Sequence, residues 1–465
     1  MQPEIINDIL ITDIADEGKA IGKDNGRIVF VTRAVPGDVV NVQVTKKRKT
    51  YCEAKVTEFK SYSPSRTQPF CEHFGICGGC RWQHLSYEAQ LQFKHKQAYD
   101  ALTRIGNAKD FEMLPIIGSE KITHYRNRLD YAFSNKKWLS REDFENKTGW
   151  NEAALGFHLP RMFDKVLDIN KCWLQDDLTN QIRNAVKKYA WDAGLTFYDY
   201  RKHSGYLRGL TLRNNAAGEW MAVMMLAYED EKKRIPLLDF IASSFPKIVS
   251  LVYVINPKKN DTIYDLEIHP YKGNPHFTER LDGLQFRISP KSFFQTNTAQ
   301  ALALYRIARS FAGFSGNEVV YDLFTGTGTI ACFIAGSVHK VTGIDNIPEA
   351  IEDARLNAGL NQITNTQFFA GDIKSVFTAE FISEHGTPDV IITDPPRAGM
   401  HEDVCRSMLN SGAKRIIYVS CNPATQARDI AILSEKYRLI KAQPVDMFPH
   451  TGHVENVAMM EKKQV

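Results

Sequence analysis

The first 60 residues carry short runs in which apolar and polar side chains alternate, as in residues 9–15 (ILITDIA) and 52–59 (CEAKVTEF). This period of two is typical of half-buried β-strands. Turn residues separate the runs at Gly22, Asn25-Gly26 and Pro36-Gly37. About five strands in so short a segment predict a small β-barrel.

The pattern changes after the barrel. Residues 61–69 form a Ser- and Pro-rich linker, and residues 87–106 have the apolar spacing of a helix. From residue 124 to about residue 275, amphipathic helical stretches alternate with strand-like runs, which are residues 126–134, 207–214, 220–228 and 248–256. This mixture predicts an α+β central domain.

From about residue 281 onward, apolar strands alternate regularly with helical stretches, and the strands are residues 319–324, 340–345, 389–394 and 415–421. Such alternation predicts a doubly wound parallel sheet, that is, a Rossmann-like α/β fold. We therefore expect three domains: a barrel over 1–60, a central α+β domain over 61–280 and an α/β domain over 281–465.

Composition adds limits on the class of protein. A chain of 465 residues with 43% hydrophobic residues has enough apolar material for several cores. The net charge of +4 fits a nucleic-acid partner, but enzymes that act on small molecules are often equally basic. The N-terminus lacks the basic and apolar regions of a signal peptide, and no apolar run is long enough to span a bilayer. We expect a cytoplasmic protein whose eight cysteines are not a disulfide framework.

A glycine-rich turn follows the first strand of the α/β domain, with Gly326 and Gly328 leading into a helix. No Lys follows the glycines, so this is not a Walker A loop. Asp345 ends the next strand, where a carboxylate can accept hydrogen bonds from a ribose diol. Asp322 would suit the positive charge of S-adenosylmethionine, and Asp372 can hold the adenine side. A nucleotide-binding oxidoreductase or an α/β domain without a ligand fits the loop equally well.

Two further motifs end the fourth and fifth strands at the same edge of the sheet. Asp394 begins Asp-Pro-Pro-Arg, and Cys421 lies in Ser-Cys-Asn-Pro. Carbon 5 of uracil accepts a methyl group only after a nucleophile has added to carbon 6, and a thiolate is suited to that addition. Glu455 is our candidate for the base that then removes the carbon-5 proton. Taken singly, such a cysteine is usually a buried packing residue and such a glutamate a solvated one; only their combination predicts catalysis.

Three cysteines, Cys71, Cys77 and Cys80, lie within ten residues of one another around a Gly-Gly pair. Cys172 is the best-placed fourth thiolate. Four thiolates suit zinc and an iron–sulfur cluster about equally. The remaining cysteines lie in apolar stretches and are predicted to be packing residues: Cys52, Cys332 and Cys405.

Five motifs in combination resemble the RNA uracil-5-methyltransferase family: SFFQTN (292–297), DLFTGTGT (322–329), DPPR (394–397), SCNPAT (420–425) and HVENV (453–457). The similarity extends over the whole chain, and the chain resembles the 23S ribosomal RNA enzymes of this family that carry an iron–sulfur cluster and an N-terminal TRAM domain. It implies an OB-like TRAM barrel, a cluster-bearing central domain and a C-terminal methyltransferase domain that uses S-adenosylmethionine.

The resemblance also implies roles for individual residues. Cys421 would be the nucleophile and Glu455 the proton acceptor, and the cofactor would lie against Gln295, Phe324, Asp345 and Asp394. The cysteine set would hold a [4Fe–4S] cluster, with Cys71, Cys77, Cys80 and Cys172 as its ligands. Many relatives carry Cys in place of Thr325 and Glu in place of Asp345; those differences leave the chemistry unchanged.

The expected substrate is a uridine of 23S ribosomal RNA, and the alternative is the same reaction on transfer RNA. Cytosine-5 methylation and a non-catalytic, RNA-binding or redox-sensing iron–sulfur protein are further alternatives. Arginines beside aromatic residues, in residues 125–128 and 207–209, are candidates for contact with RNA, because the target base must be flipped from its stack; for any single one of them, an ordinary surface salt bridge is the favoured alternative. We expect the protein to act as a monomer.

Overall fold

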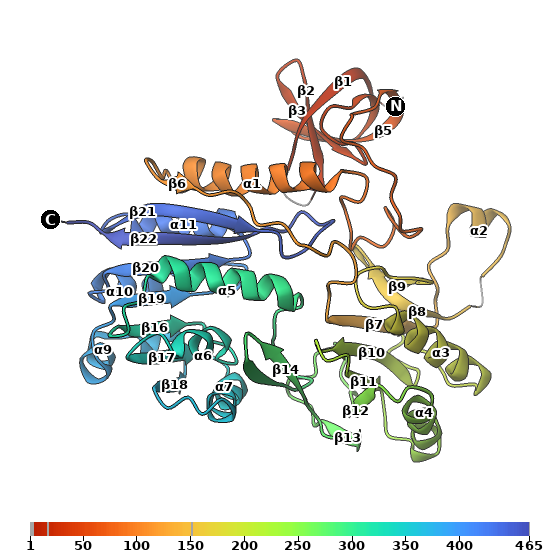
Figure 1. Cartoon of the computed structure of the whole chain (residues 1–465). Helices are drawn as coiled ribbons and strands as arrows, with labels where there is room; N and C mark the ends of the chain where they lie inside the picture. The colour runs from red at the N-terminus through yellow and green to blue at the C-terminus, as the bar shows by residue number, and fades with distance from the viewer. Residues whose placement is uncertain (1–3, 16–17, 150–151, 465) are drawn as a thin grey trace.

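The computed structural model describes residues 4–15, 18–149 and 152–464. Figure 1 shows a small barrel above two larger units, each built on its own sheet. The barrel is closed in the order β1-β2-β3-β5-β4. Its strands are β1 (Ile5–Ile14), β2 (Ala20–Asp24), β3 (Arg27–Thr32), β4 (Val39–Lys47) and β5 (Tyr51–Ser61). Alternate residues point inward, such as Val29 and Val31, which confirms the predicted small barrel.

The central unit is built on a seven-stranded sheet in the order β13-β12-β11-β10-β7-β8-β9. Helices α3 (Leu178–Asp192) and α4 (Glu231–Ser244) pack against β8 and β12, and the short α2 (Arg141–Glu145) lies apart from them (Figure 1). The strands are β7 (Arg128–Ser134), β8 (Ala154–Leu159), β9 (Met162–Asp168), β10 (Leu207–Asn214), β11 (Trp220–Leu226), β12 (Ile248–Ile255) and β13 (His269–Lys272). The hairpin β14 (Phe277–Leu281) and β15 (Leu284–Ile288) follows this sheet.

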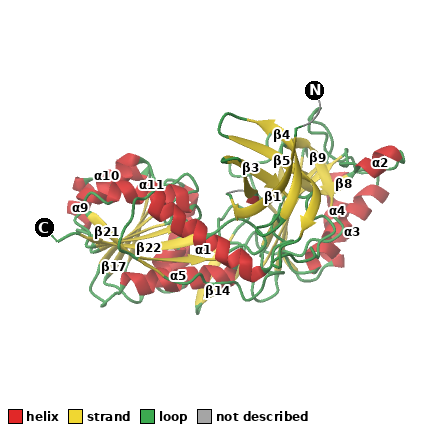
Figure 2. Cartoon of the chain, turned by 90° about the horizontal axis from the view of Figure 1, so that it is seen from above, coloured by secondary structure: helices red, strands yellow, loops and turns green. Residues whose placement is uncertain are grey.

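The C-terminal unit is an eight-stranded sheet in the order β18-β17-β16-β19-β20-β22-β21-β6. Its parallel strands are almost wholly buried, because helices cover both faces (Figure 2). The strands are β6 (Glu112–Met113), β16 (Val319–Leu323), β17 (Lys340–Asp345), β18 (Thr366–Ala370), β19 (Val390–Thr393), β20 (Arg415–Ser420), β21 (Tyr437–Val445) and β22 (Glu455–Lys462). The strand order reverses beside β16, so the carboxyl ends of β16, β17, β19 and β20 surround a crevice where ligands bind in such folds.

Two separate cores hold the helices against this sheet. One face packs against α5 (Thr298–Ala312), α6 (Thr329–Ala335) and α7 (Pro348–Leu360), and the other against α8 (Ile373–Val376), α10 (Glu402–Asn410) and α11 (Pro423–Leu433), with α9 (Ala379–His385) at the margin.

Residues 87–113 lie against the C-terminal sheet, although the sequence pattern assigns them to the central domain. Helix α1 (Tyr87–Arg104) packs along α11, and β6 pairs in parallel with the edge strand β21. The apolar face of α1 predicts that the helix packs against a core, but it does not predict which unit provides that core. The chain therefore enters the C-terminal unit, leaves it for the central sheet and then returns. Among the described residues, no helix combines the length and the hydropathy needed to cross a bilayer.

Candidate active site

The glycine-rich turn after β16 has a backbone shape that few residue types adopt. Gly326 and Gly328 have φ of 55° and 73°, and Phe324 also lies in the left-handed region at 62°. A Cβ on Gly328 would stand 2.9 Å from the Cβ of Ala354 on α7, whereas the space beside Gly326 is open. The glycines thus allow the turn to pack against α7 and leave room for a ligand over the start of α6.

Asp345 ties the end of β17 to this turn. Its two carboxylate oxygens accept hydrogen bonds from the backbone amides of Gly326 and Ile347, each at 2.9 Å. Asp372 lies further out, where it caps α8 and keeps a side chain that is 59% exposed. The two predicted cofactor residues therefore differ in setting: Asp345 is buried at the turn, and Asp372 is at the rim.

The segment that carries Gln295 is held by the central unit. Asn127 donates from its side chain to the Gln295 carbonyl at 3.0 Å and from its backbone amide to the Thr296 carbonyl at 2.8 Å. The buried guanidinium of Arg213 donates to the carbonyls of Ser289 and Ser292, both at 3.0 Å. Neither Asn127 nor Arg213 was predicted to support this site, because each contacts residues far along the chain.

Three carboxyl groups follow one another across this edge of the sheet: Asp322 and Glu455 are buried, and Asp394 is half-buried. Removal from water is the main cause that raises the pKa of Asp322 and of Asp394 to about 7 and that of Glu455 to about 8, and a nearby carboxylate adds to each shift. Asp322 accepts a hydrogen bond from the Thr325 hydroxyl at 2.6 Å. A cationic ligand would favour the ionised form of these groups, so the row is suited to a sulfonium.

Cys421 directly follows β20 and Glu455 begins the neighbouring, antiparallel β22. In the ladder between β20 and β22, Ser420 pairs with Asn456, which places Cys421 next to Glu455. Burial first, and then Glu455 and Asp394, raises the pKa of the Cys421 thiol to about 12, and Arg397 opposes the shift. The thiol therefore needs a partner that accepts its proton before it can act as a nucleophile.

Cys421 lines a cavity of about 190 Å³. Arg397, Asn422 and residues 451–454 also line it. So do Gly78 and Gly79, from the cysteine-rich loop. The cysteine-rich loop thus lies beside Cys421, although it ends more than 200 residues before β16 begins.

The four predicted cluster ligands lie around one cavity of about 410 Å³: Cys71, Cys77, Cys80 and Cys172. The same two glycines border this cavity, so it adjoins the one around Cys421. Burial is the main cause that raises the pKa of the Cys80 thiol to about 12 and that of Cys172 to about 11. Within residues 4–15, 18–149 and 152–464, no three His, Cys, Asp or Glu side chains converge closely enough to hold a single metal ion.

One of the arginines predicted to contact RNA does not do so. Arg208 is 1% exposed, and its guanidinium donates to the carbonyls of Asn256, Lys258 and Asn260. It therefore holds the loop after β12, and that part of the prediction is wrong. Arg126 and Arg128 line the cavity of the four cysteines, and Arg126 lies over the Phe448 ring at 5.5 Å. Their contact with RNA stays a prediction.

The fold and the crevice define an S-adenosylmethionine-dependent methyltransferase. Residues 280–463 match the family described as tRNA (Uracil-5-)-methyltransferase, and residues 6–57 match the TRAM domain. The chain belongs to the RNA uracil-5-methyltransferase family, in the group that carries a TRAM domain. The predicted family and methyl donor are thereby confirmed.

Individual relatives agree over nearly the whole chain. An RNA methyltransferase of Bacteroides thetaiotaomicron is 52% identical over 96% of this chain and 100% of its own length. One of Chlorobaculum tepidum is 39% identical over 99% of this chain and 97% of its own. Among solved structures, the Pyrococcus abyssi tRNA (uracil-54, C5)-methyltransferase in complex with S-adenosyl-L-homocysteine aligns with a TM-score of 0.75 at 29% identity, over 97% of this chain and 99% of that one.

Proposed function

We propose that this RNA uracil-5-methyltransferase modifies a uridine of 23S ribosomal RNA, with Cys421 as nucleophile and Glu455 as proton acceptor. The observation that carries the catalytic assignment is the strand register that sets these two side chains next to each other, beside the carboxyl row. The cavity lined by Cys421, Arg397 and Asn422 gives a flipped base a polar, partly enclosed place to enter.

The chemistry then runs in three steps. The Cys421 thiol gives its proton to water, its thiolate adds to carbon 6 of the uracil, and the electron pair of the C5–C6 double bond moves onto the carbon-4 carbonyl as an enolate. Carbon 5 attacks the methyl group of the sulfonium, whose S–CH₃ bond breaks with its electron pair kept by sulfur. Glu455 takes the proton from carbon 5; the C–H electrons restore the double bond, and the thiolate leaves.

The pKa of Glu455 predicts how the rate depends on pH. Only the carboxylate can accept the proton, so the rate falls about tenfold per pH unit below the pKa of Glu455. Before the sulfonium binds, that pKa is raised to about 8; the bound cation lowers it. We expect the part of the pH dependence that Glu455 causes to end near pH 8 for kcat/KM and at a lower pH for kcat, and E455Q should lack it; any further rise at higher pH belongs to the Cys421 thiol. If the midpoint of the kcat profile lay at a higher pH than that of kcat/KM, the bound sulfonium would not lower the pKa of Glu455, and this prediction would be wrong.

The substrate assignment rests on the resemblance to the ribosomal RNA enzymes with four cluster cysteines. Transfer RNA is the second candidate, because the similar Pyrococcus abyssi protein is a tRNA (uracil-54, C5)-methyltransferase. Purified 23S ribosomal RNA and transfer RNA from cells that lack the gene, each incubated with the protein and mapped for 5-methyluridine, separate the two. A methyl group in transfer RNA alone would reject the ribosomal assignment.

We further propose that Cys71, Cys77, Cys80 and Cys172 hold a [4Fe–4S] cluster. A cubane binds one thiolate at each of its four irons, so its ligands stand around a volume rather than around one ion. A shared cavity of about 410 Å³ that all four cysteines line fits that arrangement. Such a cluster would fasten the 71–80 loop to the segment of Cys172, which Asn180 already holds through hydrogen bonds of 2.8 and 3.0 Å.

Anaerobically purified protein is therefore expected to be brown and to contain about four irons per chain. The variant C80S should lose both the colour and the iron, because the cluster loses one of its four ligands. The variant C332S is the control, since Cys332 is buried in α6, away from the cavity. Colourless wild-type protein that contains zinc would overturn the iron assignment.

A further inference from the structure

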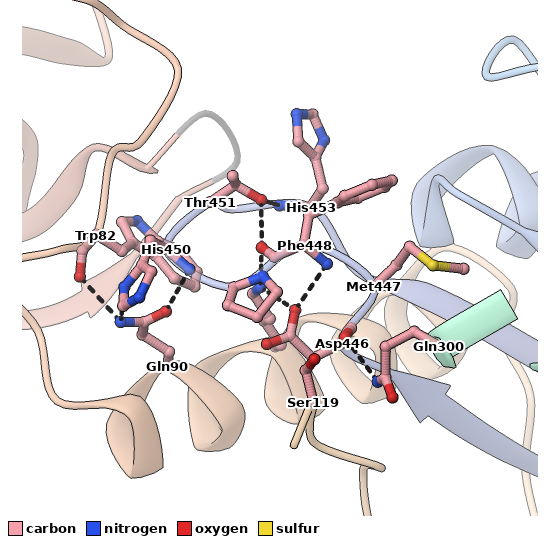
Figure 3. A network of polar contacts seen from close by, with 12 residues as sticks. Trp82, Gln90, Ser119, Gln300, Asp446, Met447, Phe448, His450, Thr451 and His453 are labelled. Atoms are coloured by element: carbon pink, nitrogen blue, oxygen red, sulfur yellow. Dashed lines mark hydrogen bonds and ion pairs between the residues drawn. The ribbon is translucent and has the colours of Figure 1, made fainter. Parts of the chain in front are cut away.

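We propose that Lys94 on α1, paired with Asp446, is a positioning residue that holds Glu455 in place for proton removal, an inference that rests on the proposed role of Glu455. Glu455 is the first residue of β22, and residues 446–454 form the loop that joins it to β21. Figure 3 shows this loop, here called the 446–454 loop, with its polar contacts.

The centre of the arrangement is a buried ion pair. Lys94 and Asp446 are both fully buried, and the Lys94 Nζ lies 2.6 Å from Asp446 Oδ1. The same ammonium donates to the Phe448 carbonyl at 3.0 Å, and the Phe448 amide donates to Asp446 Oδ1 at 3.1 Å. The Lys94 ammonium thus holds both the Asp446 side chain and the Phe448 carbonyl. These two residues lie at the start of the 446–454 loop, just beyond the end of β21.

A second contact from α1 holds the middle of the loop. The Gln90 amide group lies 3.2 Å from His450 Nδ1, and its oxygen accepts from the His450 backbone amide at 2.8 Å (Figure 3). The His450 carbonyl accepts from the amides of Arg81 and Trp82, at 2.8 and 3.0 Å. From the opposite side, Gln300 on α5 donates to the Asp446 carbonyl at 2.8 Å.

A buried ion pair contributes little to stability compared with an apolar pair of similar size, because both charges must lose their hydration. What the Lys94–Asp446 pair provides instead is one defined conformation at the start of the 446–454 loop. The loop shares the wall of the cavity around Cys421 through residues 451–454, but the position of Cys421 is fixed separately: it follows β20 and precedes α11, whose cap residue Asn422 accepts from the Ala424 amide at 3.1 Å. Displacement of the 446–454 loop should therefore impair proton removal more than thiolate addition.

The test uses two variants of the full-length protein, K94M and K94M/D446L. The single variant leaves Asp446 buried without its cation and is expected to be destabilised; the double variant removes both charges and should keep a melting temperature near that of the wild type. In the double variant we expect kcat to fall about 10- to 100-fold, the effect of a small misplacement of a catalytic group, with KM changed less. The covalent protein–RNA adduct should accumulate, because the step after methyl transfer is slowed.

The control is K96M, since Lys96 lies on the same helix but is 45% exposed and pairs with Asp13 and Asp100. A double variant that turns over at the wild-type rate would overturn the proposal, as would one that loses adduct and product in equal proportion. The proposed function fails by a different result: an E455Q protein with intact Lys94 that forms no adduct with RNA.

Discussion

The variant C421A is expected to lose methyl transfer to RNA by at least about 10⁴-fold, because no other group can replace the nucleophile that activates carbon 5. No covalent protein–RNA complex should form, since the bond to carbon 6 is made by the Cys421 sulfur. Transfer of a labelled methyl group measures the first effect, and a denaturing gel measures the second. S-adenosylmethionine should still bind, because the substitution leaves unchanged the three carboxyl groups proposed to face its sulfonium, those of Asp322, Asp394 and Glu455.

The matched control is C405A. Cys405 is fully buried in α10, does not line the cavity around Cys421, and belongs to the same core as Met408 and Tyr418. Its replacement removes one sulfur from a core and should cost a few degrees of melting temperature at most, with the adduct intact. If C421A kept measurable turnover, the nucleophile would have to be another group and the proposed mechanism would fall.

The hydrophobic pattern predicted much of the fold. The alternation in β3 and β5 predicts strands with one buried face, and the continuous apolar runs of β16 and β19 predict a covered parallel sheet. The position of α1 could not be predicted in this way. Its apolar face indicates that the helix packs against a core. The sequence pattern does not identify the partner, α11, because it lies more than 300 residues further along the chain.

For the site, too, the sequence predicted what depends on neighbouring residues and missed contacts between residues far apart in the chain. Cys421 and Asp394 could be predicted to share a crevice, because both follow parallel strands whose carboxyl ends meet at one edge. Arg208 was misassigned because an arginine on a strand next to aromatic residues resembles a surface contact, whereas it is buried and holds a loop. The pair of Lys94 and Asp446 left no signal, since its partners are 352 residues apart and each alone resembles a solvated charge.

The geometry explains why the carboxyl groups lie where they do. Asp322, Asp394 and Glu455 would repel one another if all were ionised, and burial adds to that cost. A bound sulfonium compensates for the repulsion, and after methyl transfer the cofactor is neutral at sulfur. The loss of that positive charge raises the affinity of Glu455 for a proton at the stage of the reaction when it must accept one.

The variant E455Q is expected to trap the covalent intermediate. Thiolate addition and methyl transfer precede proton removal, so Cys421 should still bond to carbon 6 and the methyl group should reach carbon 5, while release is slowed by at least about 10²-fold.

A gel band that carries both the protein and the labelled methyl group would show this state, and the double variant C421A/E455Q, which lacks the sulfur, should show none. The amide in E455Q keeps the size of the side chain but cannot accept the proton. A purely chemical defect therefore leaves the adduct in place, whereas a disturbed site would lose the adduct as well. If E455Q released methylated RNA at a near-normal rate, another residue would be the base; if it formed neither adduct nor product, Glu455 would act before the methyl transfer rather than after it.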